Sequence, residues 1–108
     1  MTPESKVLKS IVRYLETLKK EGRAVWWVKL RAGPWQQAGL PDLLVVLGTL
    51  TPSGAPLLRS GRAIFLEVKA PGQKATALQL ETMRRIRESG GVAEVVDSLD
   101  LAKEIIGW

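Results

Sequence analysis

Apolar residues recur along this chain with two periods, one typical of helices and the other of strands. Over residues 2–21 they recur every three or four positions, which predicts a helix with an apolar face formed by Val7, Leu8, Ile11, Val12, Leu15 and Leu18. Thr2 is suited to cap that helix, and Pro3 suits its first position. Shorter apolar runs predict strands over residues 24–30, 42–48, 62–69 and 92–96.

Glycine and proline divide the rest of the chain. The segment 51–61 holds two prolines and two glycines, which predicts an exposed hairpin connection. Apolar periodicity predicts two further helices, over residues 76–89 and 99–106. The resulting order, αβββαβα, is typical of an α/β fold in which helices pack on a sheet. Strand 42–48 is apolar after its first residue, so we expect it to lie in the middle of the sheet.

Composition restricts the kinds of protein that this chain can be. Its 108 residues suit one domain, 1–108, with a single core. Lys and Arg number 16 against 11 Asp and Glu, and the net charge of +5 favours a polyanionic partner such as nucleic acid. No apolar run approaches the length of a membrane span, so we expect no membrane association.

Cysteine and histidine are both absent from the sequence. The lack of cysteine excludes disulfide and thiolate–zinc scaffolds. The lack of histidine excludes a Ser-His-Asp triad, a histidine general base and any imidazole metal site. A bound metal must therefore be held by oxygen atoms, which favours Mg²⁺ or Mn²⁺ over Zn²⁺.

Two acids and a lysine stand where such a metal site could form. Asp42 begins one apolar strand, and Glu67 and Lys69 lie two apart on the next, so their side chains project to the same face. If the two strands pair, both carboxylates can converge on one metal, with the backbone carbonyl of Val68 as a third oxygen ligand. Lys69 would then lie beside the metal-bound water, where an ammonium orients it or stabilises charge on a phosphate.

Each of these residues also has a structural interpretation. Asp42 follows a proline and could simply end a turn, and Glu67 with Lys69 could form the charged face of an edge strand. Apolar neighbours crowd around that pair, however, and isolated charges in such a strand are costly unless they are paired or liganded. The combination of all three therefore favours a site.

Two helical residues are candidates with equally strong structural alternatives. Gln79 follows Thr76 at the spacing of a capping box, yet it also lies on the face expected to turn toward the sheet. Glu4 lies in line with the apolar face of the first helix, but an acid in a first turn is favoured by the helix dipole whatever its function. Both alternatives stay open for both residues.

Nucleic-acid contacts are expected around the loop that leads into Asp42. Lys29, Arg31 and Trp35 flank that loop and are suited to grip phosphate or to stack on a base. Lys74, in a second basic cluster, is a further candidate. Most other basic residues are interpreted as solvated helix faces, the N-terminal ones being Lys6, Lys9, Arg13, Lys19, Lys20 and Arg23.

In this order the motifs resemble the VRR-NUC (virus-type replication-repair nuclease) branch of the PD-(D/E)xK nuclease superfamily. The residues that carry the resemblance are Glu4, Gly39-Leu40-Pro41-Asp42, Phe65-Leu66-Glu67-Val68-Lys69, Gln79 and the strand after Gly90-Gly91. One departure is Ala75-Thr76 before Gln79, where Leu-Ser is commoner. The resemblance implies a restriction-endonuclease-like core with a mixed sheet of about four strands.

The resemblance also implies a function. Asp42 and Glu67 would be ligands of Mg²⁺ or Mn²⁺, Lys69 the catalytic lysine, and Gln79 and Glu4 supporting residues. Stand-alone members of this type are expected to be cytoplasmic, bacterial or phage-encoded homodimers that cleave branched DNA such as four-way (Holliday) junctions. Alternatives are a less selective nuclease, the cleavage subunit of a helicase–nuclease pair, or a DNA-binding module without activity.

Overall fold

Seven elements follow one another in the predicted order. The computed structural model describes residues 1–30 and 38–107, and its helices and strands are α1 (Pro3–Lys20), β1 (Val25–Lys29), β2 (Leu43–Leu47), β3 (Arg62–Val68), α2 (Ala77–Glu88), β4 (Val92–Val96) and α3 (Leu99–Ile106). Each lies within a residue or so of its predicted bounds. The differences arise at capping residues, such as Thr2, which accepts a hydrogen bond from the backbone of Ser5 and precedes the first helical residue.

The four strands form one mixed sheet in the order β1-β2-β3-β4. β1 pairs antiparallel with β2, and β2 antiparallel with β3, while β3 and β4 are parallel because α2 crosses over between them. The prediction that the strand after Asp42 is central is confirmed. The exposed connection between β2 and β3 is also confirmed, with a bridge between Leu50 and Pro56 closing its outer part.

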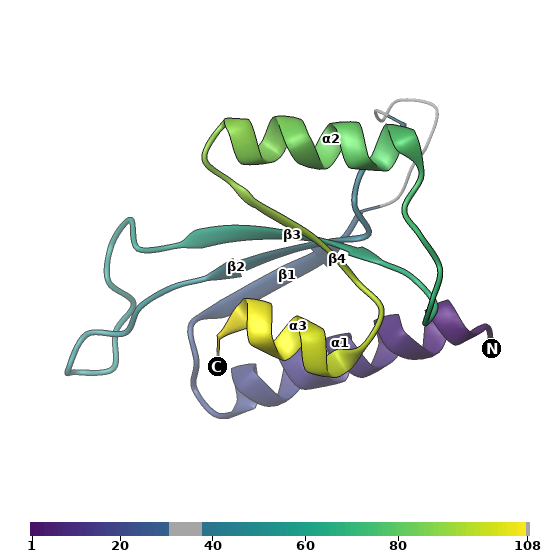
Figure 1. Ribbon diagram of the computed structural model, residues 1–108. Helices are drawn as coiled ribbons and strands as arrows, with labels where there is room; N and C mark the ends of the chain where they lie inside the picture. The colour runs from purple at the N-terminus through teal and green to yellow at the C-terminus, as the bar shows by residue number, and fades with distance from the viewer. Residues whose placement is uncertain (31–37, 108) are drawn as a thin grey trace.

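Helices cover the sheet unequally on its two faces. α1 and α3 pack together on one face, and α2 lies on the other (Figure 1). The main core fills the first of these interfaces, where Ile11 and Leu15 of α1 are fully buried. Each such side chain contributes about 1.5–3 kcal/mol to folding. The apolar face predicted for the first helix is thus the face that holds α1 on the sheet.

The polar candidate residues of the sheet lie on the face opposite the main core, as the alternation of strand side chains requires. Leu43 of β2 and both Leu66 and Val68 of β3 belong to the core beneath α1 and α3. Because successive side chains of a strand point to opposite faces, Asp42 and Glu67 project toward the α2 side. This alternation places the candidate site between the sheet and the beginning of α2.

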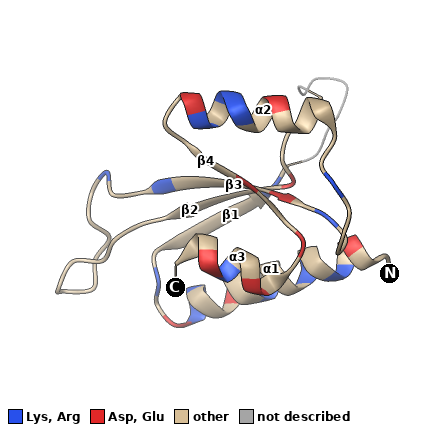
Figure 2. Ribbon diagram, viewed as in Figure 1, with Lys and Arg blue, Asp and Glu red and all other residues tan. Residues whose placement is uncertain are grey.

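Charged residues are distributed differently on the helices. Figure 2 shows basic and acidic segments on both helices, but on α1 the Lys and Arg residues predominate over Glu4 and Glu16. In the part of the chain that the structure describes, no helix is both long and apolar enough to cross a membrane.

Candidate functional site

Asp42 is fixed at the start of β2 by hydrogen bonds from both of its neighbouring strands. Its backbone N–H donates to the carbonyl of Leu66 at 3.0 Å, and its carbonyl accepts from the backbone N–H of Leu30 at 2.8 Å. Its carboxylate reaches across to β3, where Oδ2 accepts from the backbone N–H of Val68 at 2.7 Å. Asp42 therefore ends the preceding loop and also directs its carboxylate into the candidate site.

Glu67 and Lys69 lie side by side on the same face, as their spacing predicts. The side chain of Glu67 is 2% exposed and that of Lys69 is 8% exposed, and Lys69 Nζ lies 3.6 Å from Glu67 Oε1. That oxygen also accepts a hydrogen bond from Gln79 Nε2 at 2.9 Å. Glu67 Oε2 is buried and receives no hydrogen bond from the described residues. A buried carboxylate oxygen without a donor is costly and indicates a missing partner.

The environment of Glu67 opposes its ionisation. Burial is the largest cause, and the negative charge of the nearby Asp42 carboxylate adds to the effect, whereas Lys69 acts in the opposite direction. The balance raises the pKa of Glu67 from 4.5 to about 8. Two neighbouring carboxylates repel each other while both are ionised. A proton or a cation between Asp42 and Glu67 would therefore satisfy both.

Gln79 caps α2 and also contacts Glu67, while its role in a functional site stays a prediction. Its Oε1 accepts from the backbone N–H of Thr76 at 2.8 Å, and the hydroxyl of Thr76 accepts from the backbone N–H of Gln79 at 3.2 Å, which completes a capping box at the start of α2. The remaining Nε2 donates to Glu67. Because Oε1 is engaged in the cap, the amide is oriented with its N–H groups toward the carboxylate.

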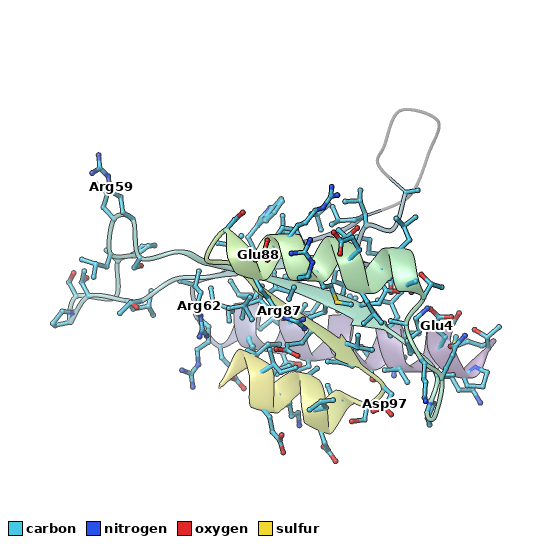
Figure 3. All side chains as sticks on the ribbon, turned by 45° about the horizontal axis from the view of Figure 1, so that its top comes forward. Glu4, Arg59, Arg62, Arg87, Glu88 and Asp97 are labelled. Atoms are coloured by element: carbon cyan, nitrogen blue, oxygen red, sulfur yellow. The ribbon has the colours of Figure 1, made fainter. Side chains whose placement is uncertain are left out.

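The donor set suits a hard divalent cation. Asp42 and Glu67 provide two carboxylates from adjacent strands, one of them with a free buried oxygen, and oxygen ligands are those that Mg²⁺ and Mn²⁺ prefer. No three acidic side chains among residues 1–30 and 38–107 lie close enough to hold a metal together. Glu4, half-buried at the N-terminal end of α1 (Figure 3), is thus not brought into the pair. Its role, and that of the Val68 carbonyl, stay predictions.

Comparison with known proteins identifies a solved structure with the same fold. A solved structure described as "VRR_NUC domain" superposes with a TM-score of 0.72, at 28% sequence identity, over 99% of this chain and 97% of that one. The chain folds as a VRR-NUC domain. It is also 39% identical over 64 residues to "Putative nuclease p44" of Acyrthosiphon pisum secondary endosymbiont phage 1. That match covers 59% of this chain and 57% of the phage protein, and no family model matches the sequence.

The structure explains why the segment Gly39-Leu40-Pro41-Asp42 begins with glycine. Gly39 has a φ of +83°, a conformation that L side chains rarely adopt, and a Cβ built on it would lie 2.8 Å from Cγ of Leu78. Leu78 belongs to the first turn of α2, so Gly39 allows the loop and that helix to approach closely. The glycine can be read from the sequence, but its close approach to Leu78 is known only from the folded structure.

The residues predicted to contact DNA are only partly described. Lys29 is exposed at the end of β1, and Lys74 is exposed in the connection between β3 and α2. Arg31 and Trp35 lie outside the described residues. All four DNA-binding roles therefore stay predictions for this VRR-NUC domain.

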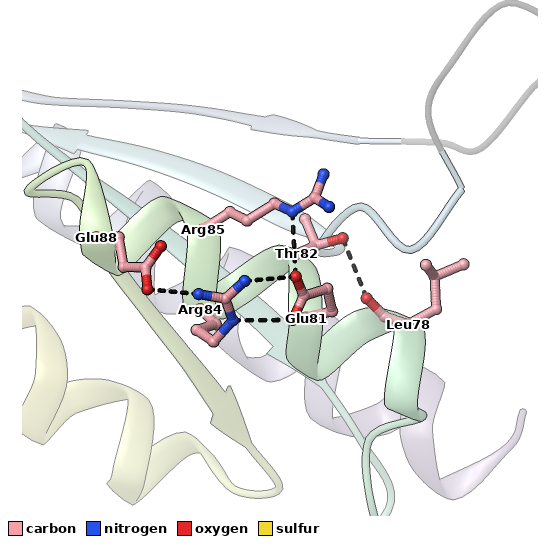
Figure 4. A network of polar contacts seen from close by, with 6 residues as sticks. All are labelled: Leu78, Glu81, Thr82, Arg84, Arg85 and Glu88. Atoms are coloured by element: carbon pink, nitrogen blue, oxygen red, sulfur yellow. Dashed lines mark hydrogen bonds and ion pairs between the residues drawn. The ribbon is translucent and has the colours of Figure 1, made fainter.

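Two basic residues of α2 are engaged with acids of the same helix, and the third, Arg87, pairs with Glu94 of β4. Arg84 forms ion pairs with Glu81 and Glu88, and Arg85 forms one with Glu81 at 3.2 Å (Figure 4). The hydrogen bonds from Arg84 and Arg85, with their positive charges, lower the pKa of Glu81 to about 2. All these side chains are well exposed, so the pairs contribute little to stability. They do neutralise one another, which leaves α2 less attractive to phosphate.

Proposed function

We propose that this chain is a metal-dependent nuclease that hydrolyses phosphodiester bonds of DNA. The observation that carries the proposal is the buried Glu67 carboxylate, which contacts Lys69 and Gln79, lies close to Asp42 and retains one oxygen without a donor among the described residues. This constellation occurs in a chain that folds as a VRR-NUC domain and is similar to a phage protein named as a nuclease. Buried charges of this kind are rarely maintained for stability alone.

The cation would be held by Asp42 and Glu67, with the backbone carbonyl of Val68 as a further oxygen. Mg²⁺ or Mn²⁺ bound there would lower the pKa of water and neutralise charge that develops on the phosphate. The residues fit because a cation would offset the repulsion between the two neighbouring carboxylates. It would also satisfy Glu67 Oε2.

Lys69 and Gln79 would have different roles in the reaction. Lys69, held at 3.6 Å from Glu67 and almost fully buried, presents its ammonium where it can orient the attacking water and stabilise negative charge on the phosphorane-like transition state. Gln79 holds Glu67 in place from the start of α2. Attack of water on phosphorus forms one P–O bond and breaks another, leaving a phosphomonoester and a hydroxyl at the cut.

The decisive experiment is a cleavage panel in Mg²⁺, Mn²⁺ or EDTA. Labelled four-way junction, flap, splayed, duplex and single-stranded DNA are compared for the wild type and for Asp42→Asn, Glu67→Gln and Lys69→Met. A matched control is Glu104→Gln, which removes one carboxylate from the exposed surface of α3. We expect the metals to support cleavage by the wild type and the control, and the three site variants to fold but not to cut.

The results separate the proposal from its alternatives. Cleavage that continues in EDTA, or that survives all three site variants, would overturn the metal site. Cutting of every substrate would leave the nuclease and remove the preference for branched DNA. Tight binding without cutting under any condition would favour a DNA-binding module or a nuclease that requires a helicase partner.

We further propose that the chain acts as one domain and pairs with a second copy through the uncovered part of the sheet. Trp26 and Val28 of β1 share a face with Val46 and Leu44 of β2 on the α2 side. α2 packs mainly on β4, so no described helix covers this apolar surface, and Trp26 is 57% exposed. Burying such a patch favours association, and a two-fold dimer would present two sites to a two-fold junction.

Oligomeric state tests this surface directly. We expect light scattering to report a dimer for the wild type and a monomer for Trp26→Lys. Leu58→Lys, at an even more exposed leucine of the hairpin connection, is the matched control and should remain dimeric. A monomeric wild type would exclude the homodimer. Because its proposed substrate is DNA, we also expect this protein to act in the cytoplasm of a bacterium.

A further inference from the structure

A groove of about 490 Å³ runs between α1 and the end of β1, and its walls are basic. Lys9 and Arg13 of α1 line one wall, and Lys29 of β1 lines the other. Half-buried Leu8 and Val12 contribute to its floor. Among the described residues that line it, Glu16 is the only acid. The groove is thus long, open and positive.

The groove lies at the same end of the sheet as the candidate metal centre but on the opposite face, which α1 covers. Lys29 pairs with Leu43, the residue that follows Asp42, and the next residue of the chain, Leu30, donates its backbone N–H to the Asp42 carbonyl. Lys29 therefore lies one strand away from Asp42, at the same end of the sheet. The α1 residues that line the groove run from Ser5 to Glu16, so the groove follows α1, and DNA that reaches both the groove and the site would pass the edge formed by β1.

The basic side chains of the groove differ from those of α2 in their partners. Arg84 and Arg85 of α2 are paired with acids of their own helix. Within residues 1–30 and 38–107, no ion pair engages Lys9, Arg13 or Lys29, and all three are exposed. Their charges are therefore free to attract an anion. Three cations along one groove match the repeated charges of a phosphate backbone better than a single small anion.

We infer that this groove binds the sugar–phosphate backbone of the DNA flanking the cut, an inference that rests on the proposed nuclease function. Lys9 and Arg13 were expected from the sequence only to be solvated helix residues. Folding brings them into the same groove as Lys29, so the three cations can contact one strand of the DNA. Contacts of this kind fix the register of DNA on the protein without reading its sequence, and they extend the binding surface beyond the metal centre.

Binding in EDTA tests the groove separately from cleavage. The wild type and the variant Lys9→Ala/Arg13→Ala are titrated against a fluorescent duplex at several salt concentrations. We expect the variant to bind about tenfold or more weakly at low salt, with the slope of log affinity against log salt reduced by about 2, since each lost phosphate contact removes about 0.9. Lys29→Ala should reduce the slope by about 1.

The control removes a positive charge far from the groove. Arg59 lies in the connection between β2 and β3 (Figure 3) and has a φ of 63°. Arg59→Asn removes that charge with a residue that tolerates this backbone conformation. It should bind DNA as the wild type does. Thermal unfolding and Mg²⁺ titration should be unchanged in all the variants, since the altered side chains are exposed and outside the metal centre.

Failure of the groove and failure of the nuclease give different results. If the groove variants bind and cut like the wild type, the groove assignment is overturned and the nuclease stands. If they lose DNA affinity while the wild type never cuts with either metal, the groove is supported and the nuclease fails. If the groove variants lose affinity for polyglutamate but bind DNA like the wild type, the groove would be assigned to an acidic protein segment. That result would overturn the inference.

Discussion

Gln79 connects the start of α2 to the buried carboxylate of Glu67. Its amide nitrogen donates to Glu67 Oε1 at 2.9 Å, while its amide oxygen accepts from the backbone of Thr76 at 2.8 Å. The helix cap therefore determines which end of the amide faces the acid. The sequence leaves Gln79 open between a helix cap and a site residue, and in the structure it caps α2 and contacts the proposed metal ligand.

Substitutions at position 79 should separate these two roles. Gln79→Ala removes both contacts, so we expect a loss of about 1 kcal/mol in the free energy of unfolding together with weaker Mg²⁺ binding. Gln79→Glu keeps an oxygen for the cap but places a second carboxylate against Glu67, so its unfolding without metal should become more sensitive to pH. Thermal unfolding and isothermal titration with Mg²⁺ measure both effects. Unchanged Mg²⁺ affinity in both variants would restrict Gln79 to capping.

The pKa of Glu67 predicts how the metal-free protein responds to pH. Folding raises that pKa from 4.5 to about 8, so the folded state holds a proton that the unfolded state has lost. This contribution to stability is complete below about pH 4.5 and is lost as the pH rises toward 8, with a slope of at most about 1.4 kcal/mol per pH unit. Denaturant unfolding in EDTA between pH 5 and pH 8 measures it.

Two variants and added Mg²⁺ serve as controls for the pH dependence of the free energy of unfolding. Glu67→Gln cannot titrate, so its stability should change less with pH over this range, whereas Glu104→Gln should behave like the wild type. Mg²⁺ competes with the proton, and for this reason it should raise the unfolding temperature more at pH 8 than at pH 5. An equal pH slope in Glu67→Gln would mean that other groups cause the effect.

Lys69 is expected to affect catalysis far more than DNA retention. Lys69→Met keeps most of the side-chain volume and removes the ammonium, so we expect cleavage to fall by about 100-fold or more while binding in EDTA stays near that of the wild type. Lys69 also lowers the pKa of Glu67, so in this variant the pH-dependent loss of stability should extend to higher pH. Parallel cleavage and binding assays decide the point. A variant that cuts normally would exclude a catalytic role for the lysine.

Gly39 should be far less tolerant of substitution than a glycine with the same backbone conformation in open space. In Gly39→Ala the added Cβ would lie 2.8 Å from Cγ of Leu78, in addition to the strain of a positive φ. Gly22 has a φ of +85° with nothing within 4 Å, so Gly22→Ala carries only the conformational cost, about 1–2 kcal/mol. Chemical denaturation should show a larger loss in Gly39→Ala. Equal losses would mean that Leu78 moves aside freely.

The amino-acid sequence determined the elements and the residue types of the site. Apolar periodicity located the seven helices and strands of residues 1–30 and 38–107, because the period of apolar residues and the positions of glycine and proline are local properties of the chain. The spacing of Glu67 and Lys69 fixed that they share a face. The absence of histidine and cysteine restricted any metal ligands to oxygen. None of these inferences required knowledge of which segments meet.

Tertiary structure decided what those residues contact. Pairing of β2 with β3 places the Asp42 carboxylate on the backbone of Val68, and packing of α2 allows Gln79 to cap its helix and bind Glu67 at once. Such contacts join residues that are distant in the chain, so local patterns cannot reveal them. The same holds for Lys9, which periodicity assigns only to a polar helix face. Only the position of α1 beside β1 makes it one wall of a basic groove.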